Sequence, residues 1–179
     1  MRKLFFLMLI CFSTSFAFAQ NSQKALSVRE LGEEFLKRKS KVAGDEFSFK
    51  MFDSLESNSA EAREFCFRVT THIAKNADGI LAEAIGYYWL DYLTMYPNDF
   101  FKNYSLLNGE EKQLWHEYLT WVIMIKADFD KTEAIARGKR ELFKIRKSCE
   151  SCETEDLKLF DDFTIMVLKT IDKNIQESN

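Results

Sequence analysis

The chain has 179 residues, with 25 Lys and Arg against 28 Asp and Glu, and a net charge of −3 at pH 7. This acidic balance argues against nucleic-acid binding and against docking on an anionic membrane surface, because both need a basic surface. One proline, six glycines and 17 phenylalanines, beside abundant Glu and Lys, indicate an all-α protein rather than a sheet protein.

The first twenty residues, MRKLFFLMLICFSTSFAFAQ, have the layout of a cleaved secretory signal. Arg2 and Lys3 precede an apolar run over residues 4–12, and an Ala-Phe-Ala site follows at residues 17–19. The apolar run is shorter than the roughly 20 residues that a membrane-spanning helix needs. No other stretch of the chain is long and apolar enough to cross a bilayer.

A lipid anchor on Cys11 is the weaker alternative for this segment, because the bulky Ile10 precedes it where a small residue is expected. We therefore expect residues 1–19 to be removed, with cleavage near Ala19–Gln20. The mature protein is then periplasmic or extracellular, where disulfides form and persist.

Residues 20–27 are polar and expected to be loose, and residues 28–179 are expected to form a single helical domain. Apolar residues recur at helical spacing at Val28, Leu31, Phe35 and Val42. Residues 47–55 mix alternating and helical spacing, which we interpret as a short helix. Ser59 has the position of an N-cap before the helix that follows.

The remaining helices are separated by residues that end or begin helices. Pro97 and the pair Asn108–Gly109 are breakers, and Asp130 or Thr132 caps the penultimate helix. These helices are expected over residues 79–96, 98–107, 110–129, 131–147 and 155–175. The sequence predicts about seven helices in all, packed as antiparallel hairpins because the connections are short.

One internal echo links two of these helices. The stretch WLDYLTM begins at Trp89 and WHEYLTW begins at Trp115, with Trp, an acid, Tyr, Leu and Thr in register. The favoured interpretation is two amphipathic helices of similar composition. The alternative is a short degenerate helical-repeat stack, loosely similar to HEAT-type repeats.

The second faces of the same two helices are less charged than those of a lone surface helix. Tyr87 and Leu90 lie opposite the main apolar stripe of the first helix, and His116, Thr120 and Ile123 do so in the second. Such faces are typical of middle helices covered on two sides, or of a face that meets a partner. Tyr87 and Leu90 are therefore candidate partner-binding residues.

The stretch RKSCESCETED carries Cys149 and Cys152 at C-x-x-C spacing. In an exported protein this spacing predicts a local disulfide that fixes the turn between the last two helices, with Cys66 left as a buried free thiol. A redox role is the alternative. It is disfavoured because Cys149 follows the C-terminal end of a helix, where the helix dipole opposes a thiolate.

A zinc site is a further alternative for the same cysteines. It would need two more ligands, and His72 and His116 are the histidines that could complete it. His116 lacks the second histidine of an H-E-x-x-H motif, so a metalloprotease site is not indicated. The sequence contains no phosphate loop, nucleophile elbow or dinucleotide fingerprint, and we expect no cofactor.

The stretch ARGKRELFKIRK, residues 136–147, is a basic run on one helix. Ile135, Leu142 and Ile145 are expected to face inward. The opposite face is then an outer ridge that could receive an acidic partner, made of Lys139, Arg140, Lys144 and Lys147. The leading functional hypothesis is therefore a non-enzymatic interaction or scaffold protein with a protein partner. The alternative is a thiol redox or metal-binding protein that uses Cys149 and Cys152.

Overall fold

The computed structural model describes residues 27–38, 46–149 and 152–177. Within these residues every regular element is helical, so the predicted all-α class is confirmed. There are eight α-helices and one short 3₁₀ helix: α2 (Val28–Arg38), α3 (Glu46–Asp53), η1 (Ser54–Glu56), α4 (Ala60–Ala74), α5 (Gly79–Met95), α6 (Pro97–Ser105), α7 (Gly109–Ile125), α8 (Lys131–Ser148) and α9 (Thr154–Glu177).

Several sequence predictions fall outside this part of the chain. They are the secretory signal over residues 1–19, its cleavage site near Ala19–Gln20, most of the segment 20–27, and Val42. Among the residues that the structure describes, no helix combines the length and the apolar character needed to span a bilayer.

The helix boundaries follow from local chemistry. The side chain of Ser59 accepts a hydrogen bond from the backbone N–H of Ala62, as expected of an N-cap. Asn108 and Glu111 form a capping box at the start of α7, each side chain accepting from the backbone N–H of the other. Asp130, rather than Thr132, caps α8. Pro97 takes the first position of α6, where its missing N–H costs nothing.

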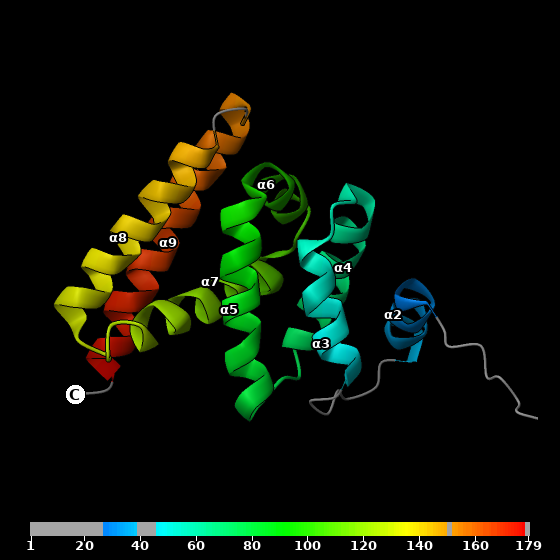
Figure 1. Ribbon diagram of the computed structural model, residues 1–179. Coiled ribbons are helices and arrows are strands. Elements are labelled where there is room, and N and C mark those ends of the chain that lie inside the picture. Colours follow the sequence, from blue (N-terminus) through cyan, green and yellow to red (C-terminus); the bar gives the residue numbers. More distant parts are fainter. Residues whose placement is uncertain (1–26, 39–45, 150–151, 178–179) are drawn as a thin grey trace, which may run out of the picture.

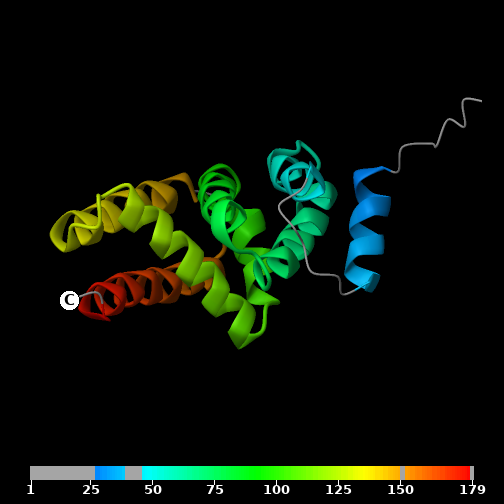
Figure 2. The ribbon, with the colours of Figure 1, turned by 90° about the horizontal axis from the view of Figure 1, so that it is seen from below.

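The helices are arranged along one direction, with α2 at one end and the hairpin of α8 and α9 at the other (Figures 1 and 2). Helices α8 and α9 run side by side in opposite directions, as predicted for a short connection (Figure 1). Helix α7 joins the terminal hairpin to the centre of the molecule because it packs against both α5 and α9.

Helices α5 and α7, which carry the internal echo, cross in close contact. A Cβ atom at Gly86 would lie 2.8 Å from the carbonyl oxygen of Tyr118, so only glycine allows this approach. The first residues of the two echoed stretches meet at the crossing, where the rings of Trp89 and Trp115 stack with centroids 3.5 Å apart. The echo therefore marks a helix crossing, and the HEAT-type stack stays a prediction.

The core around this crossing is aromatic, and the N–H groups of its two stacked indoles are both paired. The indole N–H of Trp89 donates to Thr70 Oγ1 at 3.2 Å, and that of Trp115 donates to Thr71 Oγ1 at 3.0 Å. Both threonines lie on α4, which thus lines the crossing with hydroxyl acceptors. Helix α9 joins this core through Phe163, whose ring centroid is 5.4 Å from that of Phe100.

Candidate functional site

Cys149 and Cys152 lie at the tip of the α8–α9 hairpin. Cys149 is the C-cap of α8, and Cys152 lies two residues before the first residue of α9. The two residues are at disulfide-bonding distance, with Cα atoms 5.2 Å apart, which is within the usual range. Cys149 is 4% exposed, whereas Cys152 is half-buried. The predicted pair is thus brought together, with one sulfur more accessible than the other.

Asn98, in the first turn of α6, lies against both sulfurs. Its side-chain oxygen Oδ1 is 2.7 Å from Cys152 Sγ and 3.6 Å from Cys149 Sγ. One turn further along α6, the ring of Phe101 packs on Phe160 of α9, with centroids 5.2 Å apart. This apolar contact holds the start of α6 at the hairpin tip. The α6 side of this region also borders a surface hollow of about 270 Å³ lined by Met95, Tyr96, Pro97, Asn98, Asp99 and Ser148.

Cys66 is the free thiol of the described residues. It lies on the buried face of α4, as predicted, and burial raises the pKa of its thiol to about 11. The thiol therefore stays protonated at neutral pH, and it is inert as a nucleophile.

The basic run of α8 forms the expected outer ridge. The helix turns Ala134, Gly138, Leu142 and Ile145 inward. On its exposed side are Lys139, Arg140, Lys144 and Lys147. Phe143 stands among these four basic side chains with 59% of its surface exposed. The ammonium group of Lys147 lies 5.0 Å from the centre of the Phe143 ring, which is within cation–π range.

Two of the four basic side chains on this face of α8 pair with neighbouring acids. Arg140 pairs with Glu133 at 2.5 Å, and Lys144 lies 3.5 Å from Glu141. The side chains of both pairs are at least partly exposed, so each pair contributes little stability. The basic side chains can therefore give up these acids for the acids of a partner. We call the five residues Lys139, Arg140, Phe143, Lys144 and Lys147 the α8 ridge.

The two candidate partner-binding residues of α5 differ in their surroundings. The ring of Tyr87 is half-buried, with the ammonium group of Lys126 5.3 Å from its centre. Leu90 is only 5% exposed and belongs to the core cluster. Its burial follows from the packing of α5 against several neighbours, so the second face of this helix is covered by the protein itself at this position.

The two histidines are structural in their contacts. His116 is buried, and its Nε2 atom is 2.6 Å from the hydroxyl oxygen of Tyr104. Its Nδ1 atom is buried without a hydrogen-bond partner. Burial, and then the charge of Lys112, lowers the pKa of His116 to about 4. His72 packs edge-on against Phe35, with ring centroids 5.4 Å apart.

These positions do not assemble the composite zinc site considered from the sequence. Within residues 27–38, 46–149 and 152–177, no group of three or more His, Cys, Asp and Glu side chains could hold a metal ion. His116 is committed to the aromatic core beside Phe163, at a centroid distance of 5.3 Å.

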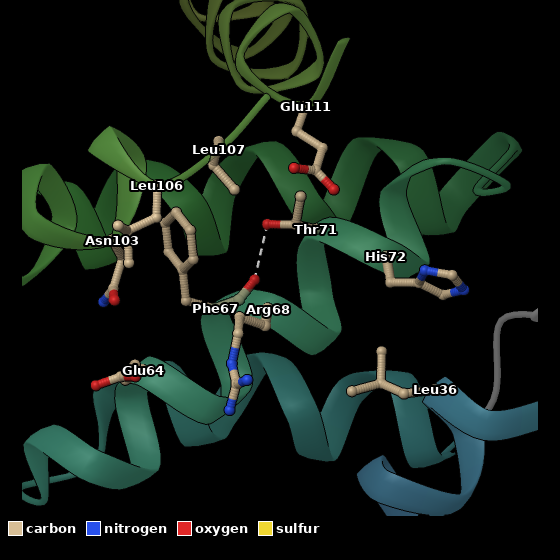
Figure 3. Close-up of a pocket in the computed structure, with 10 residues that line it drawn as sticks. All are labelled: Leu36, Glu64, Phe67, Arg68, Thr71, His72, Asn103, Leu106, Leu107 and Glu111. Atoms are coloured by element: carbon tan, nitrogen blue, oxygen red, sulfur yellow. Dashed lines mark hydrogen bonds between the residues drawn. The ribbon is translucent and has the colours of Figure 1, made fainter. Parts of the chain in front are cut away.

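A separate pocket of about 320 Å³ lies between α2, α4 and the α6–α7 connection (Figure 3). Its side chains include apolar ones such as Phe67 and Leu107 and charged ones of both signs. Thr71 already donates a hydrogen bond to the carbonyl oxygen of Phe67 at 2.7 Å, the dashed line in Figure 3. Glu111 is paired with Lys75 at 2.9 Å. The lining therefore favours no single class of ligand.

Comparison of the chain with models of protein families, with curated proteins and with solved structures finds no significant match. Two features of the outer hairpin are therefore the candidate functional sites: the cysteine pair with Asn98, and the α8 ridge. Asn98 and Phe143 were not singled out by sequence reasoning. Phe143 could have been found there, because it lies outside the apolar stripe of its own helix.

Proposed function

We propose that this protein is an exported helical interaction domain that binds an acidic segment of a partner protein along the α8 ridge. The observation that carries the proposal is Phe143, an aromatic side chain that is 59% exposed and surrounded by basic groups. Export is inferred from the N-terminal signal pattern, and the interaction role from this surface.

The fold does not require an aromatic residue at this position. Helix α8 buries its inward stripe at Ala134, Gly138, Leu142 and Ile145, and Phe143 lies outside it. A charged residue would serve packing equally well there and would hydrate better. Aromatic residues, Phe among them, and arginine are enriched at the centres of protein interfaces relative to the rest of the surface.

The charge of the ridge selects the chemistry of the partner. Four basic side chains surround one apolar ring in a chain whose net charge is −3. Such a local excess steers acidic segments towards the surface and disfavours basic ones. When the segment binds, the ring of Phe143 can contact an apolar side chain of the segment, and water leaves this contact.

A second exposed aromatic pair gives a matched control. Trp121 on α7 and Phe129 in the α7–α8 turn are 45% and 49% exposed, with ring centroids 5.3 Å apart. Asp128 and Asp130 flank Phe129 in the chain. This pair is somewhat less exposed than Phe143 and lies beside acidic residues, so it is not expected to attract an acidic segment.

The test uses a fluorescein-labelled acidic peptide with two leucines among six Glu and Asp residues, and a Lys-rich peptide with the same leucines. Fluorescence anisotropy with residues 20–179 should show binding of the acidic peptide alone, weakening as salt rises. Phe143→Ala and the double change Lys139→Glu/Lys144→Glu should each weaken this binding about tenfold or more, the order expected of a hot-spot residue. Trp121→Ala should leave it unchanged.

Equal binding of both peptides, or a loss caused by Trp121→Ala and not by the ridge variants, would refute the proposal. Absence of binding to the acidic peptide would refute it as well. Binding to vesicles of anionic phospholipid without binding to the peptide would replace a protein partner by a membrane surface.

A further inference from the structure

The contact between Asn98 and the two cysteines depends on their oxidation state. A thiol hydrogen can be donated to the Asn98 carbonyl oxygen, which lies 2.7 Å from Cys152 Sγ and 3.6 Å from Cys149 Sγ. A disulfide carries no such hydrogen. The same oxygen thus gains hydrogen bonds only when the pair is reduced, so its interaction energy favours the dithiol.

The amide of Asn98 can also serve the oxidised state, less well. If the amide group turns over, its N–H faces sulfur, which is a weak hydrogen-bond acceptor. The orientation found in the structure turns the oxygen of Asn98 towards both sulfurs, and this orientation suits the reduced pair. Asn98 therefore makes the disulfide easier to open than a cysteine pair of the same spacing without such a neighbour.

The two sulfurs differ in their accessibility to an incoming thiol. Cys149 is 4% exposed, whereas Cys152 is half-buried. Thiol–disulfide exchange requires a thiolate to approach one sulfur in line with the bond that breaks. Cys152 is the more exposed residue of the pair, so we assign its sulfur as the one attacked and Cys149 as the leaving group.

The hairpin does not depend on the disulfide for its geometry. Its helices are joined by buried side chains, including Leu142, Ile145 and Phe160, and by an ion pair between Arg146 and Asp161 at 2.9 Å. The bond closes a ring with only Glu150 and Ser151 between the cysteines, and such a small ring contributes little chain entropy. The pair can therefore open while α8 and α9 stay packed.

The structure also weakens the electrostatic objection raised by the sequence. Cys149 follows the C-terminal end of α8, which opposes a thiolate. However, α6 begins at Pro97, so the first turn of a second helix faces the same sulfurs through Asn98. The first turn of α6 carries the positive end of its helix dipole, which is opposite in sign to the C-terminal end of α8.

We propose that Cys149–Cys152 is an exchangeable disulfide that accepts two electrons from a dithiol protein, with Asn98 stabilising the reduced pair. A thiolate of the donor attacks Cys152 Sγ, the Cys149–Cys152 bond breaks, and Cys149 leaves as a thiolate that takes a proton from water. The second donor thiol loses its proton and attacks the donor's own sulfur in the mixed disulfide, which releases Cys152 as a thiolate. Cys152 then takes up a proton, the donor ends as a disulfide, and this protein ends as a dithiol.

The first test measures the equilibrium of residues 20–179 with mixtures of reduced and oxidised dithiothreitol, followed by acid quenching and maleimide labelling. Asn98→Ala should shift the equilibrium about fivefold to tenfold towards the disulfide, the size of one net hydrogen bond. Asn98→Asp keeps an acceptor oxygen, so its equilibrium should stay near that of the unaltered protein. Ser105→Ala, at the far end of α6, is the control.

A shift of less than twofold for Asn98→Ala would overturn the role of Asn98. A disulfide that dithiothreitol opens only after the protein is denatured would overturn the exchange itself. Circular dichroism shows whether each variant is folded, and Asn98→Ser replaces Asn98→Ala if the latter is not.

The second test compares single-cysteine forms of the pair, using the aromatic disulfide 5,5′-dithiobis(2-nitrobenzoate) as a probe. Cys149→Ser leaves Cys152, which should react about tenfold faster or more than the Cys149 left by Cys152→Ser, because accessibility limits the attack. Equal rates, or faster reaction of Cys149, would overturn the assignment of Cys152 as the attacked sulfur.

Discussion

The central block of α4, α5, α6 and α7 and the outer hairpin of α8 and α9 use their aromatic residues in opposite ways. In the block, Trp89 and Trp115 are fully buried and each indole N–H has a threonine acceptor. In the hairpin, Phe160 and Phe163 are buried, but Phe143 stands in solvent among basic side chains. The block buries the two tryptophan rings at its centre and exposes Trp121 near Phe129 and its acidic neighbours, whereas the hairpin exposes Phe143 among basic side chains.

This difference separates stability from binding within one domain. A helix covered on several sides has little surface left for a partner, and changes to it are expected to cost folding free energy. The outer face of α8 and the hairpin tip carry the ridge and the cysteine pair, where changes are expected to alter binding or redox exchange at little cost in stability. Substitutions in the two regions should therefore differ in how much folding free energy they cost.

The largest effect is expected for Trp115→Ala in the block. It removes a fully buried ring that stacks on Trp89 and on Phe67, so it should lower the free energy of unfolding by about 3–5 kcal/mol. Urea denaturation of residues 20–179 measures this value. The matched change Trp121→Ala, at an exposed tryptophan of the same helix, should cost less than about 1 kcal/mol. Equal costs would abolish the contrast.

The next effect concerns acid stability and His116. Its pKa is about 4 in the folded protein, against an ordinary value near 6.5, because burial favours the neutral ring. The unfolded chain therefore binds more protons between these two values, and stability should fall as the pH drops from 6.5 towards 4. The loss is about 3 kcal/mol for a shift of this size.

His116→Gln separates this contribution from that of the carboxylates. The amide can still pair with Tyr104 but does not titrate in this range, so the difference between the two stability curves should be the histidine contribution alone. Urea midpoints measured between pH 4 and 7 give both curves. Parallel curves would contradict the burial of a neutral imidazole.

A third effect tests the crossing of α5 and α7. Gly86→Ala places a Cβ atom against the carbonyl oxygen of Tyr118 and the side chain of Val122, so the two helices must separate. We expect a loss of about 2 to 3 kcal/mol. Gly109→Ala, at the first position of α7 where nothing lies within 4 Å, should be neutral or slightly stabilising. Thermal unfolding followed by circular dichroism compares the two.

The sequence predicted the parts of this molecule that depend on local patterns. Helical spacing, the breakers Pro97 and Gly109, and the caps at Ser59 and Asp130 each act within a few residues. The pairing of Cys149 with Cys152 was likewise local. The inward stripe of α8 was predicted at Ile135, Leu142 and Ile145; the last two are buried and Ile135 is half-buried.

The other features of the candidate site depend on contacts between segments far apart in the sequence, and a local sequence pattern does not predict such contacts. Asn98 reaches Cys152 across 54 positions, and that meeting is set by the packing of α6 on α9. Leu90 lies on a helix face of mixed polarity, which is compatible with either a partner protein or a neighbouring helix. In the structure this residue is buried within the protein itself. No sequence motif indicated that His116 is buried. Its Nδ1 atom lacks a partner because residues far along the chain, such as Phe163, enclose the ring.

The smallest effect is expected for the double change Cys149→Ser/Cys152→Ser at the hairpin tip. The ring is short, so loss of the bond should cost at most about 2 kcal/mol. Helices α8 and α9 keep their buried contacts, and the α8 ridge keeps its residues, so binding of the acidic peptide should be unchanged. A decrease of more than about 3 kcal/mol in the free energy of unfolding, or loss of peptide binding, would show that the disulfide is needed for the structure of the hairpin and of the α8 ridge.

Thiol labelling of the unaltered, oxidised protein completes this comparison. Because Cys66 is buried on α4, the native protein should not react with maleimide, and denaturation without reductant should release Cys66 as the one reactive thiol of residues 20–179. Labelling of Cys66 in the native state would show that the central block opens as readily as the hairpin tip. Because the hairpin tip opens without unfolding of the central block, native protein treated with dithiothreitol should instead be labelled at Cys149 and Cys152, while Cys66 stays protected.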